Sequence, residues 1–271
     1  MHTTYFLRPA AKLALVAALS TSINARADDA DIDVPGPTGR SWVAIDGSYA
    51  RSSADTDYGA GFQSSSRTSS RSIALYGTYA INEKVDVSLA ATRYLYRSTS
   101  TYSFGSSQYS DASNSTSVGL RVRAWGTPTS EGFGLVGAVS AGHSEGGSTS
   151  YVGVLMPQYR FNESLLASFA LGLVRGSDDW RSQFAQASLV WKAAPDLSII
   201  PGVNWDRWDR NNGYPSQHSL QVDLGASYHL NHNLSVLAWA YVGRTSDVDT
   251  GLFRITNSRS RGASLGLRWA F

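Results

Sequence analysis

The amino-acid sequence predicts an all-β fold: a closed antiparallel transmembrane β-barrel of about twelve strands, with short turns at one end and long loops at the other. Three observations predict it. Apolar and polar residues alternate with a period of two, connections alternate between short and long, and no apolar run after the N-terminal region is long enough for a transmembrane helix. The mean hydropathy of −0.21 agrees with this fold, because only every second residue of a barrel wall faces lipid.

The first residues follow the order of a cleaved secretory signal. Arg8 and Lys12 form a positive region, an apolar run covers Leu13 to Leu19, and Ala25-Arg26-Ala27 supplies a small-x-small cleavage site. The apolar run is too short to cross a bilayer as a helix. We therefore expect this segment to be removed on export.

Cleavage divides the chain into three parts. Residues 1–27 are the expected signal peptide, residues 28–40 an extended periplasmic lead with Pro35 and Pro37, and residues 41–271 the barrel. The mature part keeps 20 basic residues against 21 acidic ones, so it is close to neutral. This balance gives no support for a nucleic-acid partner.

The period-two pattern defines the strands. It is clearest where Leu220, Val222 and Leu224 alternate with polar or small residues, and again over Ala263–Phe271. Each predicted segment is long enough to cross a membrane as a tilted strand. The predicted strands are 41–52, 69–79, 85–97, 114–125, 132–142, 150–161, 164–175, 182–193, 197–208, 217–230, 234–244 and 260–271. Pro157 and Pro201 interrupt two of them, and we expect β-bulges there because proline removes a ladder donor.

Short and long connections between the predicted strands alternate along the chain. Short ones contain the Asn, Asp or Pro that tight turns favour, and long ones are rich in Ser, Gly, Asn and Thr. With the N-terminus inside and an even strand count, all short turns are periplasmic and all long loops extracellular. The short turns centre on 81–84, 127–129, 162–163, 194–196 and 231–233, and the long loops include 53–68, 98–112, 209–216 and 245–258. A soluble sandwich has no reason to sort its loops in this way.

The end of the chain resembles a known signature. Leu265, Leu267, Trp269 and the terminal Phe271 are similar to the C-terminal strand of bacterial outer-membrane proteins, a porin-like class, although they identify no family within it. The resemblance implies a location in the bacterial cell outer membrane, contact with outer-membrane lipid, and recognition of the strand ending in Phe271 by the barrel-assembly machinery.

Closure of the sheet follows from the membrane environment, where every backbone polar group needs an internal partner. The first strand, Trp42–Ala50, should therefore pair with Ala263–Phe271, and Val43, Ile45 and Tyr49 should face lipid. Aromatic residues near the strand ends should form the two interfacial girdles: Tyr49, Tyr79, Tyr159, Phe161, Trp205, Tyr228, Trp269 and Phe271.

The residues that alternate with the lipid-facing ones are predicted to line the lumen. Its small residues suggest a narrow open passage, and its charges are the candidate site residues: Asp46, Asp86, Arg121, Arg123, Arg160, Asp223 and Arg268. A charge on the lipid face would cost about 2–4 kcal/mol at mid-membrane. We expect Asp86 to meet Arg123, and Asp46 to meet Arg268 across the closing seam. Two interpretations stay open: a self-neutralising structural network, or a polar constriction that sorts solutes by charge.

The sequence predicts no catalytic residue, cofactor or transition-metal site. In Gly142-His143-Ser144-Glu145-Gly146 the adjacent His and Ser point to opposite faces of a strand, so the pair is not arranged for hydrolysis. Acidic residues at 206–210 and 247–249 could hold calcium, but exposed loop charge is the favoured interpretation.

The favoured function is a passive channel for small hydrophilic solutes, without enzymatic activity. The alternatives are a structural or surface-interaction (adhesin-like) outer-membrane protein and a polymer-export barrel. The transported solute, the binding partner and the oligomeric state are not encoded in any motif of the sequence.

Overall fold

The computed structural model describes residues 35–271 except 60, 103, 178–179 and 211–214. It is a single antiparallel sheet in which each strand pairs with its sequence neighbour. The strands are β1 Trp42–Asp57, β2 Gln63–Asn82, β3 Val85–Tyr102, β4 Gly105–Trp125, β5 Gly132–Ser144, β6 Ser148–Asn162, β7 Leu165–Gly176, β8 Trp180–Ala194, β9 Leu197–Arg210, β10 Gln217–His229, β11 Leu234–Thr245, β12 Val248–Asp249 and β13 Arg254–Ala270.

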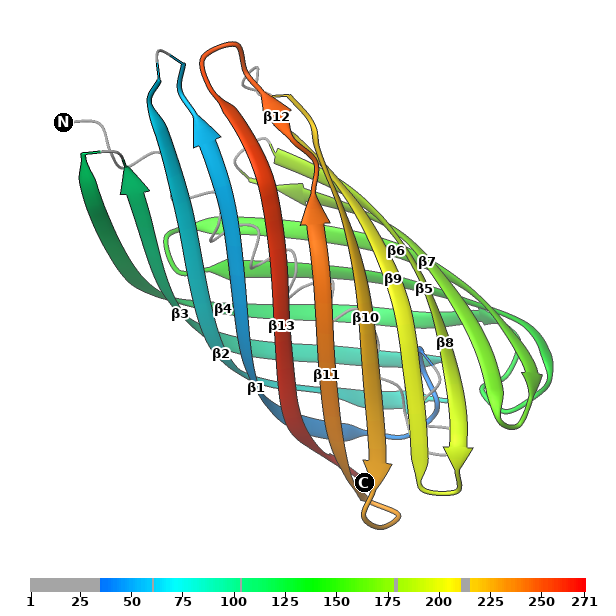
Figure 1. The fold of residues 1–271 in the computed structure, drawn as a ribbon. Helices are drawn as coiled ribbons and strands as arrows, with labels where there is room; N and C mark the ends of the chain where they lie inside the picture. Colours follow the sequence, from blue (N-terminus) through cyan, green and yellow to red (C-terminus); the bar gives the residue numbers. More distant parts are fainter. Residues whose placement is uncertain (1–34, 60, 103, 178–179, 211–214) are drawn as a thin grey trace.

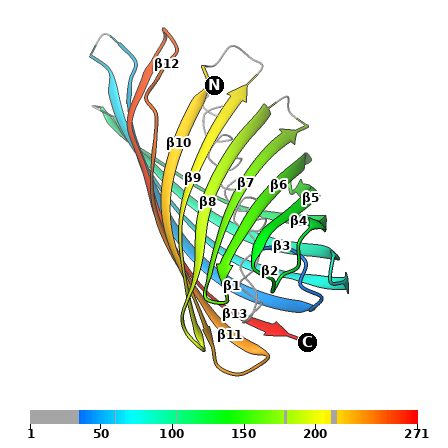
Figure 2. The ribbon, with the colours of Figure 1, turned by 90° about the vertical axis from the view of Figure 1, so that its right-hand side faces the viewer.

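The sheet closes on itself. β1 pairs with β13 from Trp42 opposite Ala270 to Asp57 opposite Arg254, and β13 lies between β11 and β1 (Figure 1). The two-residue β12 only flanks β13, so twelve long strands form the wall and the predicted closed barrel is confirmed. The strands are strongly inclined (Figure 2), as closure of a sheet requires. Among the described residues, no helix has the length and hydrophobicity of a membrane span.

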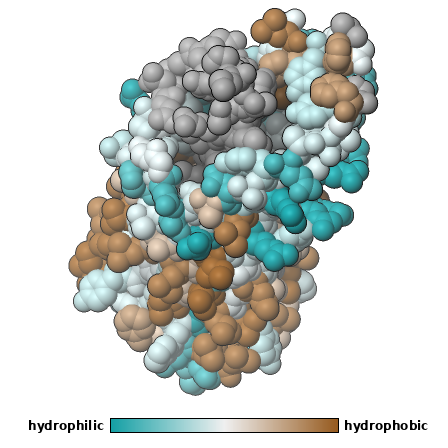
Figure 3. Space-filling model, turned by 90° about the vertical axis from the view of Figure 1, so that its left-hand side faces the viewer, coloured by the Kyte–Doolittle hydropathy of each residue, from teal (hydrophilic) through white to brown (hydrophobic). Residues whose placement is uncertain are grey.

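The apolar parity faces outward. Ile45 is 52 % exposed, Leu89 61 % and Leu265 64 %, as expected for side chains that contact lipid rather than a core. Figure 3 shows hydrophobic side chains over the lower half of one face, with a hydrophilic band above them. The predicted girdle residues all point outward as well, from Tyr49 and Trp205 at 38 % exposed to Phe271 at 70 %.

Three of the five predicted short turns are stabilised by asparagine. The side-chain oxygens of Asn82 and Asn162 each accept a hydrogen bond from the backbone N–H two residues later, and Asn231 accepts from Asn233 and Leu234. This local bond replaces a ladder bond and reverses the chain. The Asn residues singled out in the sequence therefore do define these turns.

At the opposite end the strands are longer than predicted. β1 and β2 continue to Asp57 and Gln63, and β3 and β4 to Tyr102 and Gly105. The expected long loops 53–68 and 98–112 are therefore wrong: both are mostly hairpin. Both faces of these hairpins are polar, so the alternation that reveals a strand in lipid is lost while backbone pairing continues.

The two prolines do not create bulges. At Pro157 the β6–β7 ladder lacks pairs between Leu155–Leu171 and Gln158–Ser168, yet the register is unchanged. Pro201 interrupts the β8–β9 ladder in the same way. The prediction of β-bulges at these prolines is therefore wrong. Each strand loses the backbone N–H donor of its proline but gains no extra residue relative to its neighbour. Register shifts occur instead near strand ends, as between Arg123 and Trp125.

Several inward aromatic rings occupy the space beside a glycine of the neighbouring strand. Trp239 covers Gly225 on β10, and Phe184 covers Gly172 on β7, each pair being directly opposite in register. A Cβ built on Gly225 would lie 1.9 Å from Cζ3 of Trp239. These glycines let bulky rings lie along the wall of the barrel.

Gly225→Ala should displace the Trp239 ring and destabilise the barrel by about 1–3 kcal/mol, the usual cost of overpacking. The denaturant midpoint in detergent and the tryptophan emission spectrum would report the two effects. Gly137→Ala on β5 is the matched control, because a Cβ there meets nothing within 4 Å. Equal midpoints for the two variants would show that the ring is free to move.

Candidate functional site: the barrel lumen

All seven charges expected in the lumen are buried on the inner side of the wall. On each strand the charged residue lies at an inward position, and the exposed apolar residues occupy the alternate, outward positions. Their exposed fractions are Asp46 5 %, Asp86 2 %, Arg121 6 %, Arg123 3 %, Arg160 7 %, Asp223 5 % and Arg268 1 %.

Asp86 on β3 binds Arg121 on β4. Arg121 donates from Nε to Asp86 Oδ1 and from Nη2 to Oδ2, each at 2.7 Å, so the pair is bidentate. The predicted partner, Arg123, was wrong by one inward position. The unbroken β3–β4 ladder, from Tyr102 opposite Gly105 to Val85 opposite Val122, places Asp86 opposite Arg121.

Arg123 instead binds the segment that leads into β1. It donates from Nε to the Pro37 carbonyl at 3.2 Å and from Nη2 to the Pro35 carbonyl at 3.4 Å, and Gln158 Nε2 donates to Pro35 at 2.6 Å. Pro37 is fully buried. Residues 35–37 therefore lie inside the barrel, and residues 28–34 of the expected lead fall outside the described part of the chain.

Gly36 explains how the segment fits. Its φ of +109° favours glycine, and a Cβ at this position would lie 2.7 Å from Cγ2 of Val136 on β5. A side chain at residue 36 would therefore push the segment off the wall.

Arg160 extends the basic group on β6. Its Nη2 donates to the Pro128 carbonyl in the β4–β5 turn at 2.7 Å, and it lies near enough to Arg123 for electrostatic interaction. Arg123 and Arg160, near the β4–β5 turn, therefore bind backbone carbonyls, whereas the neighbouring Arg121 is neutralised by Asp86.

The closing seam holds Asp46 and Arg268. Asp46 lies opposite Gly266, and Arg268 lies opposite Ala44, so the two occupy the diagonal position on neighbouring strands. Arg268 also reaches Ser227 Oγ at 3.4 Å and lies 6.0 Å from the Trp42 ring centroid. The expected Asp46–Arg268 contact agrees with this register and stays a prediction.

β9 and β10 form an acidic part of the inner wall. Asn204 and Asp206 project inward from β9, and Asp223 lies over Gly202 from β10. Asn204 Nδ2 donates to Asp206 Oδ2 at 2.8 Å. In the described chain, Asp223 has neither a hydrogen-bond nor an ion-pair partner, and its Oδ1 is buried.

One part of the lumen is apolar, which the sequence interpretation missed. Val136, Val152, Met156, Val174 and Phe184 form a buried inward cluster across β5 to β8. The available signal was that strands 150–161 and 164–175 carry apolar residues at both parities. Period-two analysis assigns such residues to the lipid face and leaves the inner ones unnoticed.

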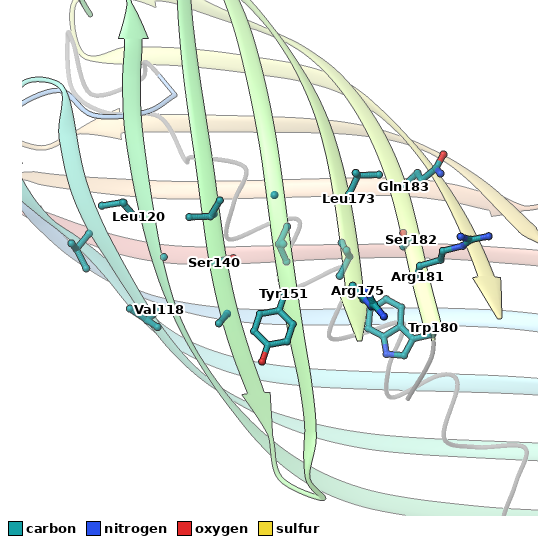
Figure 4. A pocket seen from close by; sticks show the side chains of 17 residues that line it. Val118, Leu120, Ser140, Tyr151, Leu173, Arg175, Trp180, Arg181, Ser182 and Gln183 are labelled. Atoms are coloured by element: carbon teal, nitrogen blue, oxygen red, sulfur yellow. The ribbon is translucent and has the colours of Figure 1, made fainter. Parts of the chain in front are cut away.

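A cavity of about 1070 Å³ follows the same wall. Most of its lining consists of outward residues of β3 to β8, such as Leu120, Tyr151 and Leu173 (Figure 4). The inward Val152, Val174 and Trp180 complete it. It contains none of the seven predicted charges. Because most of its lining faces outward, this cavity lies mainly on the outer side of the wall and does not mark the lumen.

The extracellular ends of β8 and β9 carry a separate ion cluster. Arg207 Nε lies 3.2 Å and Arg181 Nε 3.7 Å from carboxylate oxygens of Asp209. A hydrogen bond from Ser216, and then Arg207, hold the pKa of Asp209 below its usual value. Within the described ranges, no three His, Cys, Asp or Glu side chains gather as a metal site.

No protein-family model matches the chain, and no curated protein sequence matches it. Solved structures do resemble it. The KdgM porin has 11 % identity and a TM-score of 0.51 over 83 % of this chain and 99 % of that one. An outer membrane channel from Pseudomonas putida F1 has 13 % identity and a TM-score of 0.57 over 87 % and 96 %. The translocator domain of the autotransporter NalP from Neisseria meningitidis has 14 % identity and a TM-score of 0.56 over the whole of both chains. These likenesses establish the fold of bacterial outer-membrane β-barrels.

Proposed function

We propose that this protein is a passive channel for small hydrophilic solutes in the bacterial outer membrane. The observation that carries the proposal is the segregation of charge: seven ionisable side chains are buried on the inner side of a closed wall whose outer side is apolar. A charged inner wall supplies the polar path and the selectivity that a solute channel needs. Solved channels of the same fold support this choice.

The location and assembly partner belong to the same proposal. Phe271 is 70 % exposed beside the outward Trp269, so the terminal aromatic is accessible for recognition by the barrel-assembly machinery. The apolar outer face would contact the membrane lipid.

Single-channel recording of the refolded mature chain in a planar bilayer tests the proposal. Discrete, ion-selective conductance steps are expected. If protein shown to be folded by its heat-modifiable gel mobility stays silent, the channel is rejected.

Asp223→Asn should shift the cation-to-anion permeability ratio towards anions by about threefold, the effect of removing one unit charge roughly 7 Å from a permeating ion in water-like surroundings. Reversal potentials in a salt gradient measure the change. Arg121→Ala would be a less direct test, because Asp86 neutralises Arg121 and its removal changes stability as well as charge. An unchanged ratio in the folded Asp223→Asn protein would place Asp223 away from the ion path.

A surface-interaction role is the second proposal, and a specific observation favours it. The tips of the extended hairpins carry exposed aromatic residues: Phe62 is 54 % and Phe104 76 % exposed, and their ring centroids lie 6.4 Å apart. Aromatic patches of this kind are typical of protein interfaces. Phe62→Ser with Phe104→Ser should then abolish surface binding while conductance stays unchanged. Polymer export is less favoured, because Trp180 and Phe184 take up space inside the barrel.

A further inference from the structure

A row of arginines follows the upper border of the apolar outer face. On β1 the outward residues are Val43, Ile45, Gly47, Tyr49 and then Arg51, whose partner on β13 is Arg261. The same order occurs on neighbouring strands. In each of five consecutive strands, the first outward residue beyond the apolar run is an arginine: Arg244 on β11, Arg261 on β13, Arg51 on β1, Arg71 on β2 and Arg93 on β3. We call these five residues the arginine belt.

The belt brings like charges together. Arg51 lies directly opposite Arg261, and Arg71 is diagonal to Arg51 and to Arg93. Like charges at such positions destabilise a sheet unless an anion lies between them. All five side chains are exposed, so the wall does not bury them.

Among the residues that the structure describes, no carboxylate neutralises the belt. Arg51 donates to the hydroxyl of Tyr49, and in the described part of the chain the other four belt arginines form no ion pair or side-chain hydrogen bond. Asp55 and Asp57 lie on the same face of β1, closer to the hairpin tip. Asp55 accepts a hydrogen bond from the Asn257 side chain, and Asp57 accepts one from the backbone N–H of Gly59. On β8 and β9, by contrast, the outward Arg181 and Arg207 share Asp209.

We propose that the arginine belt binds the phosphate groups of the glycolipid that forms the outer leaflet. The belt lies where the apolar face ends on the side of the extended hairpins, which is the headgroup level of that leaflet. A guanidinium group fits phosphate with two parallel hydrogen bonds and stays charged in every relevant condition. Five such groups in a row match a lipid surface bearing several phosphates better than one small anion. The inference rests on the outer-membrane location proposed above and is independent of conductance.

The test compares two folded triple variants with equal charge change. Arg51→Gln, Arg71→Gln and Arg261→Gln remove the centre of the belt. Arg181→Gln, Arg207→Gln and Arg254→Gln are the control, because each of these three surface arginines already pairs with a carboxylate. Binding of bisphosphorylated lipid A and of its dephosphorylated form is measured by native mass spectrometry from detergent. The belt variant should bind the phosphorylated lipid about tenfold more weakly, and the control variant within about twofold of the native protein. The dephosphorylated lipid should not distinguish the three proteins.

Three results would overturn the proposal. The belt variant could bind phosphorylated lipid like the native protein, the control could lose binding equally, or inorganic phosphate could bind the belt and displace the lipid completely, which assigns the belt to a free anion. If the triple variant fails to fold, Arg261→Gln alone is measured, with a smaller loss expected. A silent bilayer recording beside intact lipid binding would reject the channel and leave this proposal standing.

Discussion

A mature chain that begins at Gly39 is expected to conduct about twofold more current per channel than one that begins at Asp28, because the deletion removes the residues that occupy the lumen. Pro35 to Pro37 are inside the wall, where Arg123 and Gln158 bind their carbonyls. Removing them would leave those side chains free to meet water and permeating ions. Single-channel amplitude in symmetric salt measures the change.

Gly36→Val tests the same point without shortening the chain. The added side chain would clash with Val136 and would force residue 36 into a strained conformation, so the segment should leave its position and the conductance should rise in the same direction. Gln158→Ala removes one of the three hydrogen bonds and should have a smaller effect. Equal amplitudes for all four proteins would mean that residues 35–37 do not restrict the ion path.

The barrel itself could be predicted because lipid imposes a simple rule on sequence. Alternation, closure and the outward aromatic residues follow from satisfying backbone groups and placing charge inward, and the sequence contains all of these signals. Outside the lipid the rule no longer applies, so the sequence predicts loops at 53–68 and 98–112 where the structure has extended hairpins.

The details of the lumen could not be predicted for two physical reasons. The ion-pair partner of a residue depends on the register of the two strands, which local turn geometry sets. Because the register differs from the expected one by one inward position, Asp86 binds Arg121, and Arg123 binds the carbonyls of Pro35 and Pro37. An apolar inner wall is also indistinguishable from an outer one by periodicity, so the cluster around Phe184 was not found.

Asp86→Ala should be the most destabilising single change, by about 3–5 kcal/mol, because it leaves Arg121 buried without its counter-charge. The side chains of this pair are 8 % and 3 % exposed, so water cannot replace the lost bonds. Denaturant unfolding of the refolded barrel measures the loss. Replacing both residues, as in Asp86→Leu with Arg121→Met, should recover most of the stability, since removing a whole buried pair is close to neutral.

This prediction also separates the two interpretations of the lumen charges. If the double variant is stable and keeps the native ion selectivity, Asp86 and Arg121 form a structural pair, and selectivity depends on charges without partners, of which Asp223 is the clearest in the described chain. If selectivity changes with the double variant, the paired charges still act on the permeating ion. The electric field of a neutral ion pair falls off within a short distance, whereas the field of a lone carboxylate reaches the permeating ion. The first outcome is therefore expected, and Asp223→Asn should shift the reversal potential more than the loss of both paired charges.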